Sequence, residues 1–190
     1  MAPNHLIASL YGREAQRETF RMSNIVPQRP RLNQLLWQRI EALEADGVAG
    51  RFPGDPGEQD GWLVTGARAA AFDDDPWIAE LLDLIRVLDA AQAPTVGVCF
   101  GHQAIALALG GTVRNTGSWG VGVRHAEMVD PSPASAPVDG GFRIAYSHRD
   151  QVVDLPATAR LTSAAAHCPV ASFAIGDHMI GIQGHPEFGT

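Results

Sequence analysis

The hydrophobic pattern in the middle of the chain alternates between short apolar runs and longer helical stripes. Residues 61–66 form an apolar run that ends in a glycine, and residues 94–98 form a second. Between them, apolar side chains at helical spacing follow Asp75 and Pro76, which suit the N-cap and first position of a helix. A further helix is expected over about 102–109, closed by a glycine pair. This order of strands and helices predicts an α/β fold with a parallel sheet.

After residue 111 the pattern changes to short apolar segments without helical stripes. We expect successive strands there, over residues 121–123, 142–146, 160–161, 171–175 and 179–183. The stretch 131–141 is rich in Pro, Ser and Gly and predicts a flexible surface loop. The architecture expected as a whole is a three-layer α/β fold, in which helices flank a mostly parallel open sheet within a single domain over 1–190.

The first quarter of the chain gives weaker signals. Residues 5–10 suggest a short strand, and the polar, basic stretch 13–31 suggests a loop. Apolar residues at helical spacing predict a helix over 32–43. The following segment 52–57 is rich in Pro and Gly, which predicts irregular structure.

The composition suits a globular domain and narrows the function classes. The 190 residues carry a formal net charge of −7, which argues against a nucleic-acid-binding surface. No apolar stretch approaches the roughly 18 residues of a membrane-spanning helix, and the first residues lack a secretory-signal pattern. The two cysteines, Cys99 and Cys168, lack the spacing of a metal or redox motif. We therefore expect a cytoplasmic protein without a metal site, a nucleic-acid partner or a membrane partner.

One short motif suggests a cysteine nucleophile. In Gly97-Val98-Cys99-Phe100-Gly101, the cysteine stands where the second apolar run meets the next helix. The two glycines permit a sharp strand-to-helix turn, and helix amides that point at a thiol favour the thiolate. The N–H of Phe100 is then placed to help bind an oxyanion. Taken alone, the motif fits a structural cysteine before a glycine turn about as well.

A second motif, near the end of the printed sequence, supplies a base. His185 and Glu187 flank Pro186, which restricts the backbone between them. In such a pair the imidazole takes the thiol proton, and the carboxylate accepts a hydrogen bond from the other ring nitrogen. Alone, this motif is more often a polar surface turn. Together with the cysteine turn, it favours a Cys-His-Glu triad that cleaves an amide through a thioester.

The chain resembles class I, triad-type glutamine amidotransferase domains, close to the stand-alone members that are similar to GMP synthase. Five segments match in the expected order: 63–66, 73–77, 97–111, 147–156 and 181–188. The resemblance implies the flavodoxin-like fold of that family, with the cysteine, histidine and glutamate named above as the triad. It also implies oxyanion amides from Phe100 and from Gly66 or Ala67, in the loop after the first apolar run.

The same resemblance implies a substrate and a reaction. Gln103 would help to hold the substrate glutamine, with Ser147 and His148 near its α-amino and carboxylate end. The thioester route releases ammonia and glutamate and requires no metal or organic cofactor. Since 190 residues leave no room for a synthetase domain, transfer of the ammonia to an acceptor would need a separate partner chain.

Two alternative functions stay open. The same triad with a roomier leaving-group pocket would hydrolyse γ-glutamyl peptides or γ-glutamyl amines. A binding or regulatory pseudo-enzyme is the other alternative, because two features depart from the family's pattern. Relatives carry Gly-Ser and then Ser-Val-Tyr-Asp in the first loop, where this chain has Gly-Ala-Arg-Ala-Ala-Ala-Phe-Asp, and the sequence stops three residues after Glu187. We therefore expect a divergent, truncated or fragmentary member of the family.

Several other residues of chemical interest have simpler interpretations. We expect Cys168 to be a small buried hydrophobe, because no activating group accompanies it. His102 is interpreted as a helix-start residue that supports the turn. His125 and His178 are expected to be exposed and without metal-ligand spacing, and Trp119, between two glycines, is expected near the rim of the site.

Overall fold

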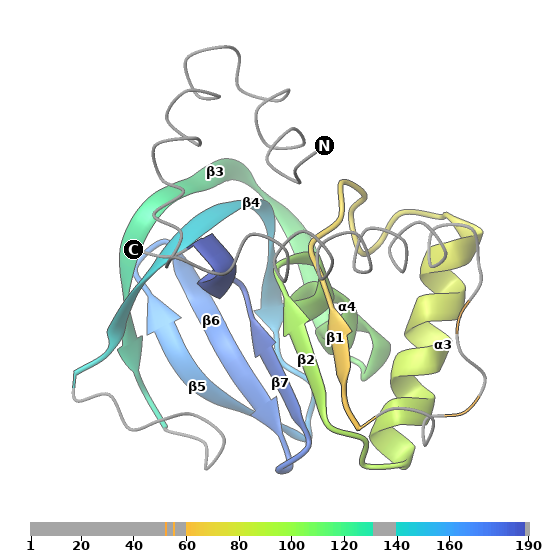
Figure 1. The fold of residues 1–190 in the computed structure, drawn as a ribbon. Helices are drawn as coiled ribbons and strands as arrows, with labels where there is room; N and C mark the ends of the chain where they lie inside the picture. The colour runs from red at the N-terminus through yellow and green to blue at the C-terminus, as the bar shows by residue number, and fades with distance from the viewer. Residues whose placement is uncertain (1–51, 53–54, 56–59, 131–139, 189–190) are drawn as a thin grey trace, which may run out of the picture.

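The structure, a computed structural model, describes residues 52, 55, 60–130 and 140–188. The elements expected over 5–10, 13–31 and 32–43, and most of the loop over 131–141, lie outside these described residues. The described elements are β1 (Trp62–Val64), α3 (Pro76–Ala90), β2 (Thr95–Val98), α4 (Phe100–Ala108), β3 (Thr112–Met128), β4 (Phe142–Asp154), β5 (Ala159–Ala165), β6 (Cys168–Ile175), β7 (Met179–Ile182) and the 3₁₀ helix η2 (Pro186–Phe188) (Figure 1). Each strand and helix expected within these residues is present.

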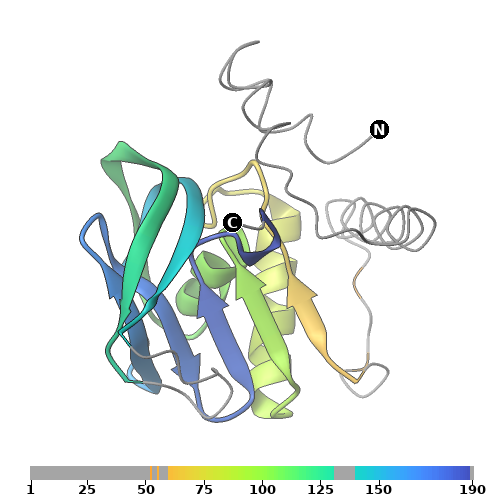
Figure 2. The same ribbon diagram turned by 60° about the vertical axis from the view of Figure 1, so that its left-hand side comes forward.

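The strands form one sheet in the order β1-β2-β7-β6-β5-β3-β4. The predicted α/β fold with a helix-flanked sheet is confirmed, although its parallel part is smaller than predicted. Only the pairs β1–β2 and β2–β7 are parallel, whereas the other described pairs are antiparallel. The reason is the connections after residue 111, since parallel pairing needs a long crossover, and short turns join β5 to β6 and β6 to β7. The long strands β3 and β4 curve away from the flatter part of the sheet (Figures 1 and 2).

Helices α3 and α4 cover one face of the parallel strands. The apolar stripe of α3 is buried as the 3.6-residue period requires: Ile78, Leu81, Ile85 and Leu88. Helix α4 packs against α3 and against β1, β2 and β7, and it is buried along almost its whole length. Arg86 Nε of α3 donates to Ala108 O at 3.0 Å, which satisfies a carbonyl at the end of α4.

The opposite face of the parallel strands is more open. Leu63 in β1 is 56% exposed, and Val96 and Ile180, its neighbours across the sheet, are half-buried. Side chains alternate along a strand, so these three point away from the helices that cover their neighbours. Both described α-helices lie on the other face, so a second helical layer, part of the expected three, is not among the elements that the structure describes.

The loop between β1 and α3 is organised by a different aspartate from the one expected. Asp75 takes the N-cap position in an extended conformation, and Pro76 starts the helix as predicted, but the Asp75 side chain makes no capping hydrogen bond. Instead, Asp73 Oδ2 accepts the Ala70 N–H at 2.8 Å, and the Asp73 N–H donates back to Ala70 O. This reciprocal pair closes a turn that fixes the path of the chain after β1.

Candidate active site

The expected turn at Cys99 is present and has an unusual backbone. Cys99 joins the end of β2 to the first residue of α4, with φ 54° and ψ −103°. A non-glycine residue at positive φ is uncommon, and such conformations concentrate at functional sites. The Cys99 N–H donates to Ile182 O at 2.9 Å, and its carbonyl accepts the Gln103 N–H at 3.2 Å. These bonds tie the turn to β7 on one side and to α4 on the other.

The two glycines of the motif are required by close packing. A Cβ on Gly101 would lie 2.0 Å from Val64 O, and a Cβ on Gly97 would lie 2.5 Å from Gly101 O. Real Cβ atoms do not approach backbone atoms this closely, so neither position accepts a side chain without a backbone shift. The turn is therefore pressed against the end of β1, and it holds Cys99 at the carboxyl ends of the parallel strands.

Three segments that are far apart in the sequence meet at this edge. A Cβ on Gly66 would lie 3.7 Å from His185 Cε1 and 3.9 Å from Cys99 Cβ. The loop after β1, the turn after β2 and the segment after β7 thus converge where ligands bind in open α/β sheets. Cys99 is half-buried and Gly66 is exposed, so the meeting point opens to solvent.

His185 is firmly positioned. Its backbone N–H donates to Ala145 O at 2.8 Å, which links the segment after β7 to β4. Its ring stacks on Phe188, with centroids 4.6 Å apart and planes 11° apart, and the residue is only 8% exposed. Glu187 lies in η2, between Pro186 and Phe188 and two residues after His185. Its contact with the imidazole stays a prediction.

The backbone groups expected to bind an oxyanion lie on two sides of Cys99. Phe100 is the first residue of α4, and the first N–H groups of a helix have no acceptor within it. The Phe100 ring is 3% exposed and packs against Trp77 at 5.6 Å, which fixes the start of the helix. Gly66 and Ala67 are exposed in the loop across from it. The roles of Phe100, Gly66 and Ala67 in binding an oxyanion stay predictions, with which their positions are compatible.

Gln103, expected to contact glutamine, is engaged within the protein. Its side chain is 4% exposed, and its Nε2 donates to Asp150 O at 2.8 Å and to Gln183 Oε1 at 3.1 Å. These bonds join α4 to β4 and to the end of β7. In this structure Gln103 therefore braces the elements beneath the site. Ser147 is half-buried on β4 opposite Val121.

His148 belongs to a buried group of rings that sequence reasoning did not recognise. It is 4% exposed and lies 5.6 Å from Tyr146 and 5.8 Å from His167, which pack edge to face on each other at 4.4 Å. His148 Nδ1 is 3.1 Å from Asp150 O, consistent with donation to that carbonyl. Within the described part of the chain, Tyr146 Oη, His148 Nε2 and His167 Nε2 have no hydrogen-bond partner. The alternation of Tyr146 and His148 along one strand is the signal that could have indicated their shared buried face.

Burial keeps this side of the site uncharged. It lowers the pKa of His148 to about 4, an effect that the bond to Asp150 O partly offsets and that repulsion from His167 and His185 adds to. Burial also lowers the pKa of His102 in α4 to about 3. The His102 ring packs on Phe173, with ring centroids 4.9 Å apart. It raises the pKa of Tyr146. All three groups are therefore neutral at pH 7.

The free energy of unfolding should consequently fall as the pH decreases from about 6.5 toward 4. In that window the unfolded chain takes up protons at His102 and His148 while the folded protein does not, so acid favours unfolding, and the effect ends above about pH 6.5. Each group contributes about 1.4 kcal/mol per pH unit at most. Chemical denaturation at several pH values should show a smaller pH slope for His102→Gln. His125→Gln, at an exposed position that leaves both buried imidazoles in place, is the control. Equal slopes for wild type and His102→Gln would contradict the assignment.

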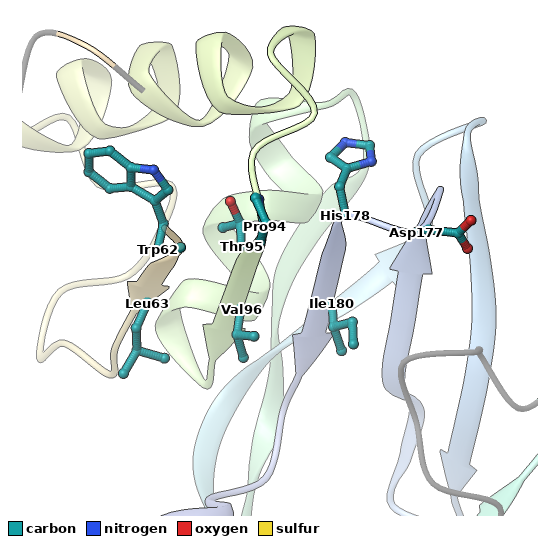
Figure 3. A pocket seen from close by; sticks show the side chains of 9 residues that line it. Trp62, Leu63, Pro94, Thr95, Val96, Asp177, His178 and Ile180 are labelled. Atoms are coloured by element: carbon teal, nitrogen blue, oxygen red, sulfur yellow. The ribbon is translucent and has the colours of Figure 1, made fainter. Parts of the chain in front are cut away.

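Among the hollows formed by the described residues, one lies far from the candidate site and a smaller one borders it. The larger, of about 480 Å³, lies at the amino ends of β1, β2 and β7, the opposite edge from Cys99. Figure 3 shows Leu63, Val96 and Ile180 on its floor and His178 at its edge. The smaller, of about 340 Å³, is lined by His185, Ala145, Ile182 and Phe188 among others.

The remaining expectations have mixed outcomes. His178 is not exposed as predicted: its side chain is 13% exposed, because Nε2 lies 2.9 Å from Asp89 Oδ1 of α3. His125 is exposed as predicted, and Cys168 is fully buried, with its thiol donating to Val170 O. No cluster of potential metal ligands occurs among the described residues, and no described helix is long and apolar enough to cross a membrane.

The fold and the convergence at Cys99 define an α/β domain with a cysteine elbow, and comparisons with known proteins agree. A family model described as "Glutamine amidotransferase class-I" matches residues 59–190. The chain belongs to this class I glutamine amidotransferase family. A second family model, "DNA/RNA non-specific endonuclease", matches residues 4–50, all outside the described residues. The expected single domain over 1–190 stays a prediction.

Individual relatives include both peptidases and synthases. "Gamma-glutamyl peptidase 3" of Arabidopsis thaliana is 33% identical over 150 residues, which are 74% of this chain and 60% of the relative. A GMP synthase of Parafrankia sp. is 36% identical over 101 residues, 53% of this chain and 19% of the synthase. The crystal structure of a glutamine amido transferase from Methylobacillus flagellatus matches with a TM-score of 0.63 and 26% identity, covering 70% of this chain and 54% of that one. The chain thus spans about three fifths of the length of the peptidases that it resembles.

Proposed function

We propose that the protein hydrolyses the γ-carboxamide of glutamine through a γ-glutamyl thioester on Cys99. The observation that carries this proposal is the meeting of Gly66, Cys99 and His185 at the carboxyl ends of three neighbouring parallel strands. A nucleophile, a base and an exposed loop amide at one solvent-open point are the parts that amide cleavage by acyl transfer requires.

The proposed reaction has two halves. His185 takes the Cys99 proton, and the thiolate attacks the γ-carbonyl carbon to give a tetrahedral intermediate. The carbon–nitrogen bond then breaks, the amine leaves with the proton from His185, and a thioester remains. Water, deprotonated by His185, cleaves the thioester, so that glutamate is released and the thiol is restored. Glu187 is proposed to hold the imidazole in the orientation that both halves need.

Backbone groups are proposed to stabilise the charge that develops on the γ-carbonyl oxygen. Phe100, at the start of α4, supplies one N–H, and Gly66 or Ala67 supplies the other from the facing loop. Loss of one such donor generally costs about 10²–10³ in rate. The same helix terminus favours the Cys99 thiolate, because the macrodipole is positive there.

The glutamate end of the substrate is proposed to bind along β4. Ser147 and His148 lie next to Ala145, whose carbonyl accepts the His185 N–H, and their backbone therefore borders the reacting centre. Gln103 fixes this part of β4 through its bond to Asp150 O. Its proposed contribution to substrate binding is thus exerted partly through the position of β4.

A second candidate function uses the same chemistry on a larger leaving group. Several relatives are γ-glutamyl peptidases, and they match 74% of this chain, whereas the GMP synthase of Parafrankia sp. matches 53%. The described rim is also open, since Gly66, Ala67 and Trp119 are exposed. These observations favour γ-glutamyl peptides or amines as further substrates. For glutamine, the synthase relatives support a separate synthetase chain as recipient of the ammonia, and we propose a cytoplasmic location.

A substrate panel tests both candidates. Purified protein is expected to release glutamate from glutamine together with ammonia, or from γ-glutamyl amines and peptides together with the free amine. Coupled assays for ammonia and glutamate distinguish the two, and circular dichroism establishes that the protein is folded. Release of glutamate from no substrate by folded protein would overturn both candidates and leave the binding or regulatory alternative.

A further inference from the structure

A buried side-chain hydrogen bond joins the helix that follows the nucleophile to the segment that carries the base. Gln183 lies two residues before His185 and is fully buried. Its Oε1 accepts a hydrogen bond from Gln103 Nε2 at 3.1 Å. Gln103 in turn lies one helical turn after Cys99, whose carbonyl accepts the Gln103 backbone N–H. The two glutamines therefore connect the residue proposed as nucleophile with the residue proposed as base.

The backbone holds the Gln183 segment within the plane of the sheet. The Gln183 N–H donates to Ala171 O of β6 at 2.9 Å. A Cβ on Gly184 would lie 2.9 Å from the Ile144 side chain, so Gly184 packs closely on β4. Side chains of a sheet stand roughly perpendicular to it, and the Gln183 side chain reaches α4 on the covered face. This contact with the helix runs in a direction that the backbone bonds of the sheet do not fix.

The amide of Gln103 has a fixed orientation. Besides the bond to Gln183, its Nε2 donates to Asp150 O of β4 at 2.8 Å, so both of its N–H groups have acceptors. His148 Nδ1 lies 3.1 Å from the same carbonyl oxygen. A rotation of the Gln103 amide would break bonds to two segments at once. Gln103 therefore offers Gln183 a donor at a defined point, four residues after Cys99.

Stability alone does not account for an amide at position 183. Within the described part of the chain, Gln183 Nε2 has no hydrogen-bond partner, although the side chain is fully buried. A buried donor without a partner costs free energy, and an apolar side chain of similar length avoids this cost. A buried polar contact does, however, restrict its neighbours to one arrangement. The arrangement restricted here is that of the base segment against α4.

We propose that Gln183 is a positioning residue that, through Gln103, sets the position of the His185 imidazole relative to the Cys99 thiol. The inference rests on the proposed function, which pairs these two groups. Proton transfer between them requires hydrogen-bond reach. A displacement of about 1 Å at a reacting centre can cost about 10² in rate. Without the bond, the segment 183–185 loses its side-chain contact with α4, and the imidazole holds less of the thiol as thiolate.

Gln183→Met tests the proposal with two measurements. The substitution keeps the length of the side chain and removes the acceptor for Gln103. We expect kcat for glutamate release to fall about tenfold or more, with a smaller change in KM, because the proposal gives Gln183 no contact with substrate. We also expect Cys99 to react about three- to tenfold more slowly with iodoacetamide at pH 7, since the thiolate is the reacting form. Both are measured in a Cys168→Ala background, which leaves Cys99 as the sole thiol.

Three further variants make the comparison specific. Gln183→Glu keeps an oxygen that can accept the Gln103 bond and should retain more of both rates than Gln183→Met. Gln183→Asn, whose shorter side chain does not reach Gln103, should lower both rates and takes the place of Gln183→Met if that variant does not fold. In the double variant Gln103→Met/Gln183→Met, alkylation should be no slower than in Gln183→Met alone, because one bond couples the two residues.

Gln151 of β4 supplies a matched control. It is 5% exposed, and its Nε2 donates to His167 O at 3.0 Å. Gln151→Met therefore removes a buried amide that takes no part in the bond between Gln103 and Gln183. We expect this variant to lose stability in urea denaturation, while the alkylation rate of Cys99 stays within about twofold of wild type.

The outcomes separate this inference from the proposed function. Unchanged alkylation and kcat in folded Gln183→Met would overturn the inference and leave the hydrolase standing. An equal loss of alkylation rate in Gln151→Met would also overturn it, because general loosening would then explain both. If folded wild type releases glutamate from no substrate, the proposed function fails, and slower alkylation in Gln183→Met but not in Gln151→Met would still support the position of His185 against Cys99.

Discussion

Replacing Cys99 by alanine is expected to lower kcat for every accepted γ-glutamyl substrate by about 10⁴-fold or more. Loss of the nucleophile from a triad removes the covalent route, and only binding and oxyanion stabilisation remain. Helix α4 starts one residue later, and the alanine methyl fits where the cysteine side chain was, so the fold should survive. Rates of glutamate release, normalised to folded protein, provide the measurement.

The other cysteine supplies a matched control. Cys168 is fully buried, its thiol donates to Val170 O at 3.3 Å, and burial raises the pKa of this thiol to about 12. A thiol in this environment stays protonated and unreactive. Cys168→Ala should therefore keep kcat within a few-fold and cost about 1 kcal/mol in the free energy of unfolding. Mass spectrometry of wild type mixed with substrate should place the γ-glutamyl adduct on Cys99. Full activity in Cys99→Ala would refute the nucleophile assignment.

The sequence was sufficient to predict the turn at Cys99 and the elements around it. Continuous apolar runs mark strands buried beneath helices, and the glycines of the turn mark a backbone path that only small residues permit. Both features are local, so β1, α3, β2 and α4 are found with boundaries shifted by one to two residues. The pairing of Cys99 with His185 came from motif resemblance, and the contacts of Gly66 now place both residues at one point.

Long-range packing could not be predicted from the sequence pattern. Tyr146 and His148 lie on β4 and His167 lies in the turn between β5 and β6, and no local period indicates that this turn meets β4. Likewise, His178 was expected to be exposed because its partner Asp89 lies in α3, 89 residues earlier. The curvature of β3 and β4 depends on an irregular register between Asn115 and Gly120 that propensity does not encode.

Substituting alanine at two glycines should separate the stability of the turn from its chemistry. At Gly101, the new Cβ would lie 2.0 Å from Val64 O, a backbone atom that cannot move without displacing β1. We expect Gly101→Ala to lower the free energy of unfolding by about 3 kcal/mol or more, at or beyond the upper range for overpacked cores. Urea denaturation followed by circular dichroism measures this change, and insoluble protein would also agree with it.

Gly66→Ala should lower activity strongly while it changes stability little. Its Cβ would make ordinary contacts, 3.7 Å to His185 Cε1 and 3.9 Å to Cys99 Cβ, so the free energy of unfolding should change by less than about 1 kcal/mol. The methyl group would nevertheless stand between the thiol and the imidazole, where the γ-carbonyl must enter. We expect kcat/KM to fall about 10²-fold, as small misplacements at a reacting centre generally cause. A stable, fully active Gly66→Ala would place the substrate elsewhere, because the space between Cys99 and His185 would then be dispensable.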